Sequence, residues 1–211
     1  MADELDNEMN LSKGRLEGLS DGIFAFAMTL LVITLIPMEV NATAVFGPEI
    51  INSLLSAFSL WILGFLVLGA FWLDHHVQYH PIQKVDRIFI WTNLILLMFV
   101  TLLPFSISFA ARYGQPMLGK QIFYANILAI GLCMSLQWGY ATAGRRLVKP
   151  TLKRVQIQKI TYTIAIIPVV SLIALSFALA GIWWGGVFFL TLPFLKLGVG
   201  YMSAGWKDTE N

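Results

Sequence analysis

The sequence predicts an all-α integral membrane protein with six transmembrane helices, from its composition and from the length of its apolar stretches. Hydrophobic residues make up 57% of the 211 residues, and charged residues only 12%. Charged residues reach about 25% in ordinary soluble domains, so a soluble fold of this length could not hide so much apolar surface. We therefore expect residues 1–211 to form a single helical membrane domain.

Six apolar stretches are long enough to cross the hydrocarbon core, for which a helix needs about 20 residues. We expect the helices at residues 16–38, 54–74, 88–110, 121–141, 160–180 and 183–201. The strands of a membrane β-barrel would alternate polar and apolar residues over short segments. The six stretches show no such alternation, so we exclude a barrel.

The segments that flank these stretches explain where each helix starts and stops. The first stretch follows a polar, acidic segment and is too long for the apolar core of a signal peptide, so we expect it to be retained. The second runs into a polar segment that contains all three histidines, and the third starts after that segment. A basic loop separates the fourth from the fifth, and the short turn GIWW joins the fifth to the sixth. Trp183 and Trp184 in this turn are expected to anchor it at the membrane interface.

Lysine and arginine residues gather on one side of this arrangement. On that side they are Lys13, Arg15, Lys84, Arg87, Arg145, Arg146, Lys149, Lys153, Arg154 and Lys159. The first loop and the last hairpin have none, and only Arg112 and Lys120 flank the middle loop of the other side. Cytoplasmic loops carry the excess of positive residues. We expect a multi-pass protein of the cell membrane with both termini in the cytoplasm.

The first helix carries charged residues where it enters the membrane, in the stretch RLEGLSDGIFAFAMTLLVITLIP. Charges at such positions are costly and point to function by default. Arg15 can extend to the headgroups, whereas Asp21 lies deeper and cannot. The two lie on different faces of a helix, so we expect each to meet a partner on another helix or subunit. Stabilisation of Asp21 by the helix dipole is the alternative.

Beyond Asp21, the residues Gly22, Phe26, Thr29 and Ile33 share one narrow face of the predicted helix, with Leu30 at its flank. The stripe is mostly bulky and apolar, with one hydroxyl midway. Ordinary helix packing explains such a stripe. A pore lining is the alternative explanation. The residues leave both interpretations open.

The histidines lie in the segment FWLDHHVQYHPIQKVDR, which also holds Asp74 and Asp86. His76 and His80 are four residues apart and could ligate a metal on one helix face. The other spans supply no further histidine and few acidic residues, so we expect no metal or other cofactor. We expect these residues to form hydrogen bonds at helix ends, where an imidazole can tether a carboxylate such as Asp21.

Asn93 is an amide within the third apolar stretch. An amide in lipid is costly unless it is paired, so we expect Asn93 to bond across to another helix. The chain contains no nucleotide-binding glycine motif, no TVGYG filter and no nucleophile with a nearby base, so we expect neither an enzyme nor a nucleic-acid-binding protein.

Several segments, taken in order, resemble the transmembrane-protein-175 family of potassium channels. RLEGLSD is similar to the family signature R-x-x-x-F-S-D, with Leu19 in place of the phenylalanine. SDGIFAFAMTLLV resembles the first helix of the family and FWLDHH its W-x-x-H-H segment. VDRIFIWTNLILLMFVTLLPF is similar to its third helix, with an aspartate, an asparagine and a final Pro-Phe pair.

The resemblance implies a homotetramer of six-helix subunits, in which four copies of the first helix line a central pore without a carbonyl filter. Carried over by position, the constriction is formed by Phe26, Thr29, Leu30 and Ile33. The motif residues that brace the pore helix are Arg15, Ser20 and Asp21. The supporting network consists of Trp72, His75, His76, Asp86 and Asn93.

The resemblance implies a channel for potassium ions in the lipid bilayer. We expect its preference for potassium to be modest, because a ring of hydroxyls has a weaker field than stacked carbonyls. A secondary transporter is the first alternative, although such proteins usually contain inverted repeats and none is visible here. A metal-dependent membrane enzyme that uses the histidine and aspartate cluster is the second alternative.

Overall fold

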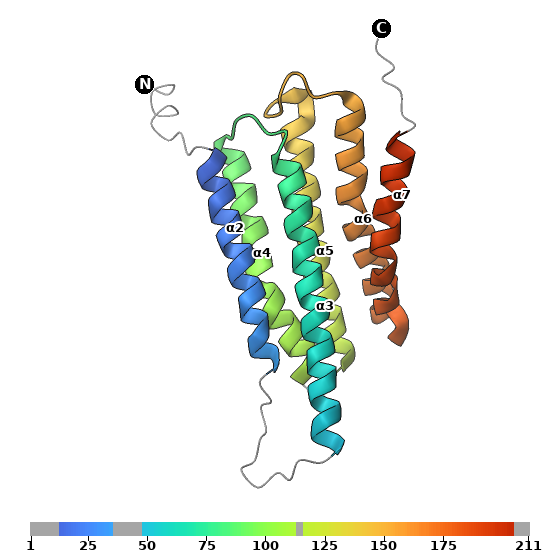
Figure 1. The fold of residues 1–211 in the computed structure, drawn as a ribbon. Helices are drawn as coiled ribbons and strands as arrows, with labels where there is room; N and C mark the ends of the chain where they lie inside the picture. The colour runs from blue at the N-terminus through green and yellow to red at the C-terminus, as the bar shows by residue number, and fades with distance from the viewer. Residues whose placement is uncertain (1–12, 36–47, 113–115, 205–211) are drawn as a thin grey trace.

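The computed structural model describes residues 13–35, 48–112 and 116–204, and in this part of the chain helices are joined by turns and short irregular segments (Figure 1). The α-helices are α2 (Lys13–Leu30), α3 (Pro48–Tyr79), α4 (Arg87–Arg112), α5 (Pro116–Thr142), α6 (Arg154–Leu179) and α7 (Leu192–Ala204). The 3-10 helices are η1 (Leu31–Leu35), η2 (Ala143–Arg145) and η3 (Trp183–Thr191). Six helical segments of the described chain are long and apolar enough to cross a membrane. The prediction of an all-α, multi-pass protein is confirmed.

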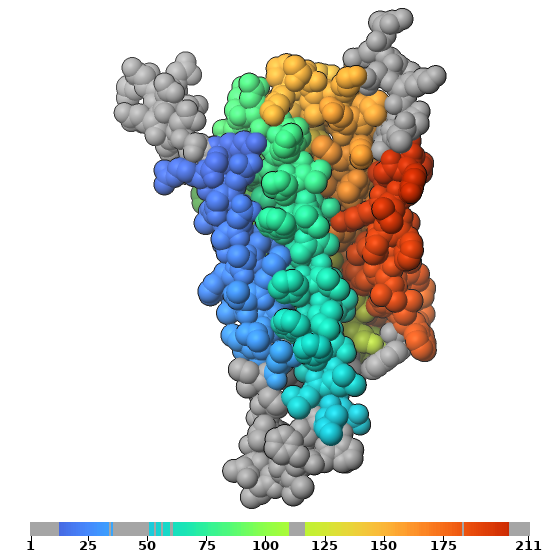
Figure 2. Space-filling view, viewed as in Figure 1, coloured from blue at the N-terminus to red at the C-terminus, as the bar shows by residue number. Residues whose placement is uncertain are grey.

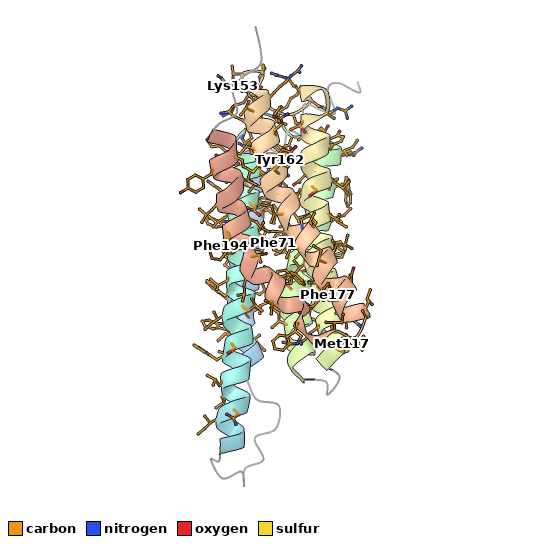
Figure 3. The ribbon with its side chains drawn as sticks, turned by 90° about the vertical axis from the view of Figure 1, so that its right-hand side faces the viewer. Phe71, Met117, Lys153, Tyr162, Phe177 and Phe194 are labelled. Atoms are coloured by element: carbon orange, nitrogen blue, oxygen red, sulfur yellow. The ribbon has the colours of Figure 1, made fainter. Side chains whose placement is uncertain are left out.

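The helices pack alongside one another as a bundle that runs up and down (Figure 1). The start of α2, the end of α7, and the turns α3–α4 and α5–α6 all lie at one end of this bundle. An isolated bridge between Ile82 and Val148 joins these two turns. Figure 3 places Lys153 at this end and Met117 near the opposite end. The basic residues of the α5–α6 turn therefore lie at the end where α2 begins, which we call the basic end.

The first span is less regular than the sequence suggests. We expected one helix over residues 16–38, whereas the α-helix ends at Leu30 and continues as the 3-10 helix η1 to Leu35. Residues 36–38 lie outside the described residues. The β-branched Val32 and Ile33 lower the helix propensity of this segment, and η1 packs against α3 and α4. We attribute the change from α-helix to 3-10 helix to these two features.

The second span is longer than expected. We placed it at residues 54–74, whereas α3 extends to Tyr79 and so includes His75 and His76. The side chain of Tyr79 is 1% exposed, and its burial stabilises the additional turn. Pro81 ends the helix, because a proline disfavours the helical conformation of the residue before it. The histidine segment is therefore mostly helix.

The last span, expected as one helix over residues 183–201, is divided into η3 and α7. A Cβ added at Gly185 would lie 2.8 Å from the carbonyl oxygen of Ala174, and one added at Gly186 would lie 2.8 Å from the Tyr124 hydroxyl. Only glycine allows this close approach to α6 and α5. Pro193 then occupies the first turn of α7, where its missing N–H costs least. Together these features account for the two-part span.

The core of the chain lies where α5 packs against α4 and α6. Pro168, inside α6, faces Gly131 of α5, where an added Cβ would lie 2.8 Å from the Pro168 ring. Figure 2 shows α2 and α3 side by side on one face of the bundle, with α7 at the other edge of this face. Helix α2 therefore has one side against the other helices of the chain and another directed outward.

Candidate functional site: the outer face of α2 and its polar anchor

Helix α2 divides into a buried face and an exposed face. The buried face consists of Leu16, Ser20, Phe24 and Ala27, followed by Leu31 of η1. On the opposite face, Phe26 is 62% exposed and Ile33 is 48% exposed, and Thr29 is also exposed. Leu30, at the flank, is half-buried. Packing within the single chain therefore does not account for the bulky stripe, which is directed towards lipid, another copy of the chain or a pore.

The hydroxyl of Thr29 has a defined orientation on this face. It donates a hydrogen bond of 2.8 Å to the carbonyl oxygen of Phe26, one turn earlier. A threonine hydroxyl has one donor and two acceptor lone pairs. Because the proton is directed to the backbone, the Thr29 oxygen has acceptor capacity left for a group outside the chain.

Three glycines follow each other on the exposed face at intervals of four residues: Gly14, Gly18 and Gly22. A Cβ at any of them would meet no heavy atom within 4 Å among the described residues. Small residues at this spacing let two membrane helices approach closely. We did not identify this feature in the sequence, although the repeated spacing in GRLEGLSDG would have signalled it. The start of α2 can accommodate a second helix.

Asp21 is held by a different side chain from the one we expected. The indole Nε1 of Trp72 donates a hydrogen bond of 2.8 Å to Asp21 Oδ1, so the partner is an indole rather than an imidazole. The ring of His76 stacks on Trp72 with centroids 5.9 Å apart. Arg15 is exposed at the start of α2 and has no ion-pair partner among the described residues. The motif aspartate therefore joins α2 to α3.

Ser20, the neighbour of Asp21, faces the core and meets a buried polar cluster. Asn93 Nδ2 donates a hydrogen bond of 3.0 Å to Ser20 Oγ, which itself donates to the Leu16 carbonyl oxygen at 2.9 Å. The Asn93 amide oxygen therefore faces His75 Nε2, 3.3 Å away, and an oxygen can only accept. His75 consequently carries its proton on Nε2. Ser20, His75 and Asn93 are each at most 3% exposed, and they link α2, α3 and α4.

Two glutamines that sequence reasoning missed extend the cluster, Gln78 from α3 and Gln137 from α5. Gln137 Nε2 lies 3.4 Å from Asn93 Oδ1 and 3.4 Å from the Tyr79 hydroxyl, and donates to both. Gln78 Nε2 donates to Gln137 Oε1 at 3.1 Å. Both glutamines are fully buried. For Gln137 the available signal was an amide in an apolar span, since such a group needs a partner.

Asp86 does not belong to this cluster. Its Oδ1 accepts a hydrogen bond of 2.8 Å from the backbone N–H of Phe89, which caps the start of α4. Its Oδ2 accepts one of 2.6 Å from the Tyr140 hydroxyl. The residues we expected in one network thus form three groups: Asp21 with Trp72 and His76, Ser20 with His75 and Asn93, and Asp86 with Tyr140.

An ion pair between α3 and α7 is a further feature that the sequence did not reveal. Lys196 Nζ lies 2.7 Å from each carboxylate oxygen of Asp74. The Asp74 side chain is 7% exposed and that of Lys196 is 23% exposed. Charged groups in a membrane are normally paired in this way. The pair fastens the last helix to the second span.

The histidine segment does not assemble a metal site in the described part of the chain. No group of three or more histidine, cysteine, aspartate or glutamate side chains lies close enough there to hold a metal ion. His75 is engaged with Asn93, while His76 stacks on Trp72. The histidines contribute hydrogen bonds and packing.

Comparisons with known proteins find similar sequences. The family model of the endosomal/lysosomal potassium channel TMEM175 matches residues 15–104, which include the motif, the histidine segment and Asn93. The chain is 28% identical to a protein of Chamaesiphon minutus named as a potassium channel, over 87% of this chain and 93% of that protein. A Chryseobacterium protein, also named as a potassium channel, is 32% identical over 59% of this chain and 60% of its own length.

Two further similarities extend these matches. The rat endosomal/lysosomal proton channel TMEM175 is 25% identical over 70% of this chain, which covers only 30% of the rat protein. The crystal structure of a lysosomal potassium-selective channel TMEM175 homolog from Chamaesiphon minutus superposes with a TM-score of 0.74 at 26% identity. This match covers 89% of our chain and 97% of the other. All these relatives are named as channels and none as an enzyme. The chain is thus similar to the TMEM175 channels, through the family model over residues 15–104 and through the Chamaesiphon minutus protein and crystal structure over most of its length.

Proposed function

We propose that four copies of this chain surround a central pore lined by α2, and that this pore conducts potassium ions with a modest preference over sodium. The observation that carries the proposal is the outward stripe of Phe26, Thr29 and Ile33, on a helix braced from behind in a family whose bacterial relatives are named potassium channels. Outward residues on the first helix would face each other across the axis of such an assembly.

The polar anchor and the glycines support this role of α2. Asp21 and Ser20 bond to two different helices, α3 and α4, and so define the rotation of α2 about its axis. Gly18 and Gly22 lie on the exposed side and leave room for a neighbouring helix near the basic end. In our proposal Arg15 reaches the neighbouring subunit, and the basic end faces the cytoplasm.

The proposed pore combines a hydrophobic gate with a single polar ring. Rings of Phe26, Leu30 and Ile33 would form an apolar constriction, and such constrictions close by expelling water. Between them, the Thr29 oxygens would present acceptors to a partly dehydrated cation, because their protons are directed to the Phe26 carbonyl oxygens. One ring of hydroxyls replaces less of the hydration shell than stacked carbonyls do. We therefore expect a modest selectivity for potassium over sodium.

The test is the reversal potential of the purified protein in a planar bilayer, with potassium on one side and sodium on the other. We expect a reversal shifted towards the potassium equilibrium potential, and a loss of this shift in Thr29→Ala. Thr101→Ala is the matched control, because Thr101 of α4 is also exposed and donates to the backbone one turn earlier, at 2.7 Å. Absence of current from folded protein, or an equal loss in both variants, would refute the assignment.

The name of the rat relative makes the proton a second candidate permeant ion. The same bilayers, with equal potassium on both sides and a pH gradient, separate the two. A reversal potential that follows the pH gradient would assign proton conduction to the pore. A reversal potential near zero under these conditions supports potassium.

A further inference from the structure

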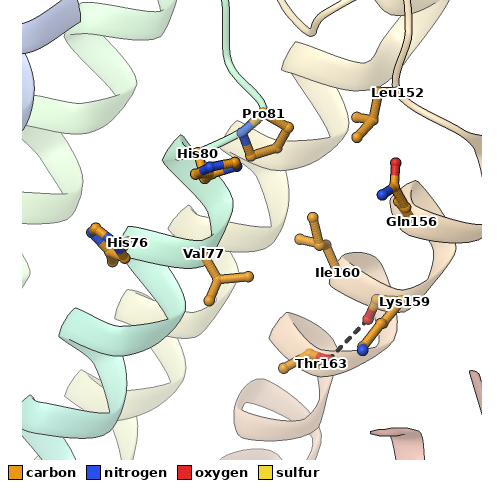
Figure 4. A pocket seen from close by; sticks show the side chains of 9 residues that line it. All are labelled: His76, Val77, His80, Pro81, Leu152, Gln156, Lys159, Ile160 and Thr163. Atoms are coloured by element: carbon orange, nitrogen blue, oxygen red, sulfur yellow. Dashed lines mark hydrogen bonds between the residues drawn. The ribbon is translucent and has the colours of Figure 1, made fainter.

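A cavity of about 420 Å³ lies between the end of α3 and the beginning of α6, away from the exposed face of α2. Figure 4 shows that α3 and α6 form its two walls. The lining side chains that matter here are His76, Val77 and His80 from α3, and Lys159, Ile160 and Thr163 from α6. The proposed pore does not use this cavity.

The lining combines an apolar wall with basic groups at its rim. Val77 and Ile160 are apolar, as are Pro81 and Leu152 nearby, and no acidic residue lines the cavity. Lys159 is exposed, and among the described residues its ammonium group has no ion-pair or hydrogen-bond partner. The imidazole of His80 is likewise exposed and has no side-chain partner in the described part of the chain. This chemistry suits a molecule with an apolar body and an anionic head.

The location of the cavity indicates where such a molecule comes from. The cavity lies at the basic end, beside the turns α3–α4 and α5–α6, which contribute Pro81 and Leu152 to its lining (Figure 4). Lys159 lies in the first turns of α6, which begins at Arg154. This is the depth at which a transmembrane helix leaves the hydrocarbon core and meets the headgroups. Basic pockets between helices on the cytoplasmic side bind anionic lipid headgroups.

We propose that this cavity binds one anionic phospholipid of the cytoplasmic leaflet. The lipid phosphate lies between Lys159 and His80, and an acyl chain follows Val77 and Ile160 into the membrane. His76 lines the same cavity and stacks on Trp72, which holds Asp21 of the pore helix. The lipid would therefore contact His76, which stacks on Trp72, and the hydrogen bond from Trp72 to Asp21 anchors α2. The inference takes the orientation of the basic end from the proposed function, but binding is measured without any current.

The experiment is native mass spectrometry of the purified protein, titrated in detergent with phosphatidylglycerol or with phosphatidylcholine of the same acyl chains. We expect phosphatidylglycerol to bind more tightly, with one high-affinity lipid per chain. Lys159→Gln is expected to weaken phosphatidylglycerol binding about five-fold, which corresponds to about 1 kcal/mol per basic residue near the headgroups. Binding of phosphatidylcholine is expected to stay unchanged.

Lys149→Gln is the matched control, because Lys149 is an exposed lysine of the same basic end but does not line the cavity. An equal loss of phosphatidylglycerol affinity in this control would show that the basic end attracts the lipid without a specific site, and would overturn the proposal. Unchanged affinity in Lys159→Gln would overturn it as well. Ile160→Trp fills the cavity and is expected to remove the high-affinity binding of phosphatidylglycerol. Displacement of phosphatidylglycerol by inorganic phosphate would identify a soluble anion as the ligand and overturn the lipid assignment. An unchanged oligomer mass in the same spectra shows that each variant is folded.

Discussion

Trp72 Nε1 donates a hydrogen bond of 2.8 Å to Asp21 Oδ1 and joins α3 to α2 across 51 positions of the sequence. The adjacent residue Ser20 accepts a bond from Asn93 of α4. Two neighbouring residues of α2 are thus tied to two different helices. A single tie would leave α2 free to rotate about that contact, whereas two divergent ties define which face points outward.

The tie to Trp72 is expected to contribute measurably to stability. Trp72→Phe removes the donor while it keeps an aromatic ring beside His76. A hydrogen bond to a charged group contributes about 1.5–3 kcal/mol, so the melting temperature of the purified protein should fall. Trp91→Phe is the control, because Trp91 is 62% exposed on α4. Equal melting temperatures of the two variants would contradict the role of the bond.

Asn93 is expected to be the residue on which the buried cluster depends most. Asn93→Leu keeps the volume of the side chain but leaves His75 and Gln137 without their common acceptor. Each unsatisfied buried group costs about 1–3 kcal/mol. Thermal unfolding should show a large loss for Asn93→Leu and little change for Asn52→Leu, since Asn52 is exposed on α3. A stable Asn93→Leu protein would show that the cluster is dispensable.

Phe26 is expected to restrict the current through the proposed pore. Phe26→Ala shortens a side chain that is 62% exposed in the subunit, so the subunit should keep its stability while the constriction widens. We expect a larger leak current in planar bilayers. Phe194→Ala on α7 is the control, because Phe194 is 75% exposed. An unchanged current in Phe26→Ala would place Phe26 outside the pore.

The Asp74–Lys196 pair is expected to behave as a buried ion pair. Lys196→Met leaves the carboxylate of Asp74 alone, and loss of one partner of a buried pair costs about 3–5 kcal/mol. The double variant Asp74→Leu with Lys196→Met has no unpaired charge and should recover most of the stability. Melting temperatures of the two single variants and the double variant measure this coupling. A double variant that is no more stable than Lys196→Met would show that the two charges are not coupled.

The contact between Gly131 and Pro168 is expected to exclude any larger residue on α5. Gly131→Val would push a side chain into the rigid Pro168 ring, and overpacking of this kind costs about 1–3 kcal/mol. Gly139→Val, on the same helix, is the control, because a Cβ added at Gly139 meets no atom within 4 Å. The two variants share the same change in helix propensity, so the difference between their melting temperatures isolates the contact. Equal melting temperatures of the two variants would mean that α6 can move away from the larger side chain without loss of stability.

The positions of Phe26 and Thr29 show which part of the candidate site could be predicted from the sequence. Helical periodicity alone placed both residues on one face. It left open whether that face packs inside the subunit, because the period gives the relative directions of side chains but not the rotation of the helix against its neighbours. Burial of Phe24 and Ala27 decided this point.

The sequence by itself determined the six-span helical architecture, because the thickness of the hydrocarbon core sets the length of each apolar stretch. It also determined that Asp21 and Asn93 need partners, since unpaired polar groups are costly in a membrane. Only the tertiary structure decided which residues are the partners of Asp21 and Asn93. Asp74 and Lys196 are 122 positions apart, and no spacing rule connects them. Their pairing depends on which helix faces meet, and the packing of all the spans together sets those contacts.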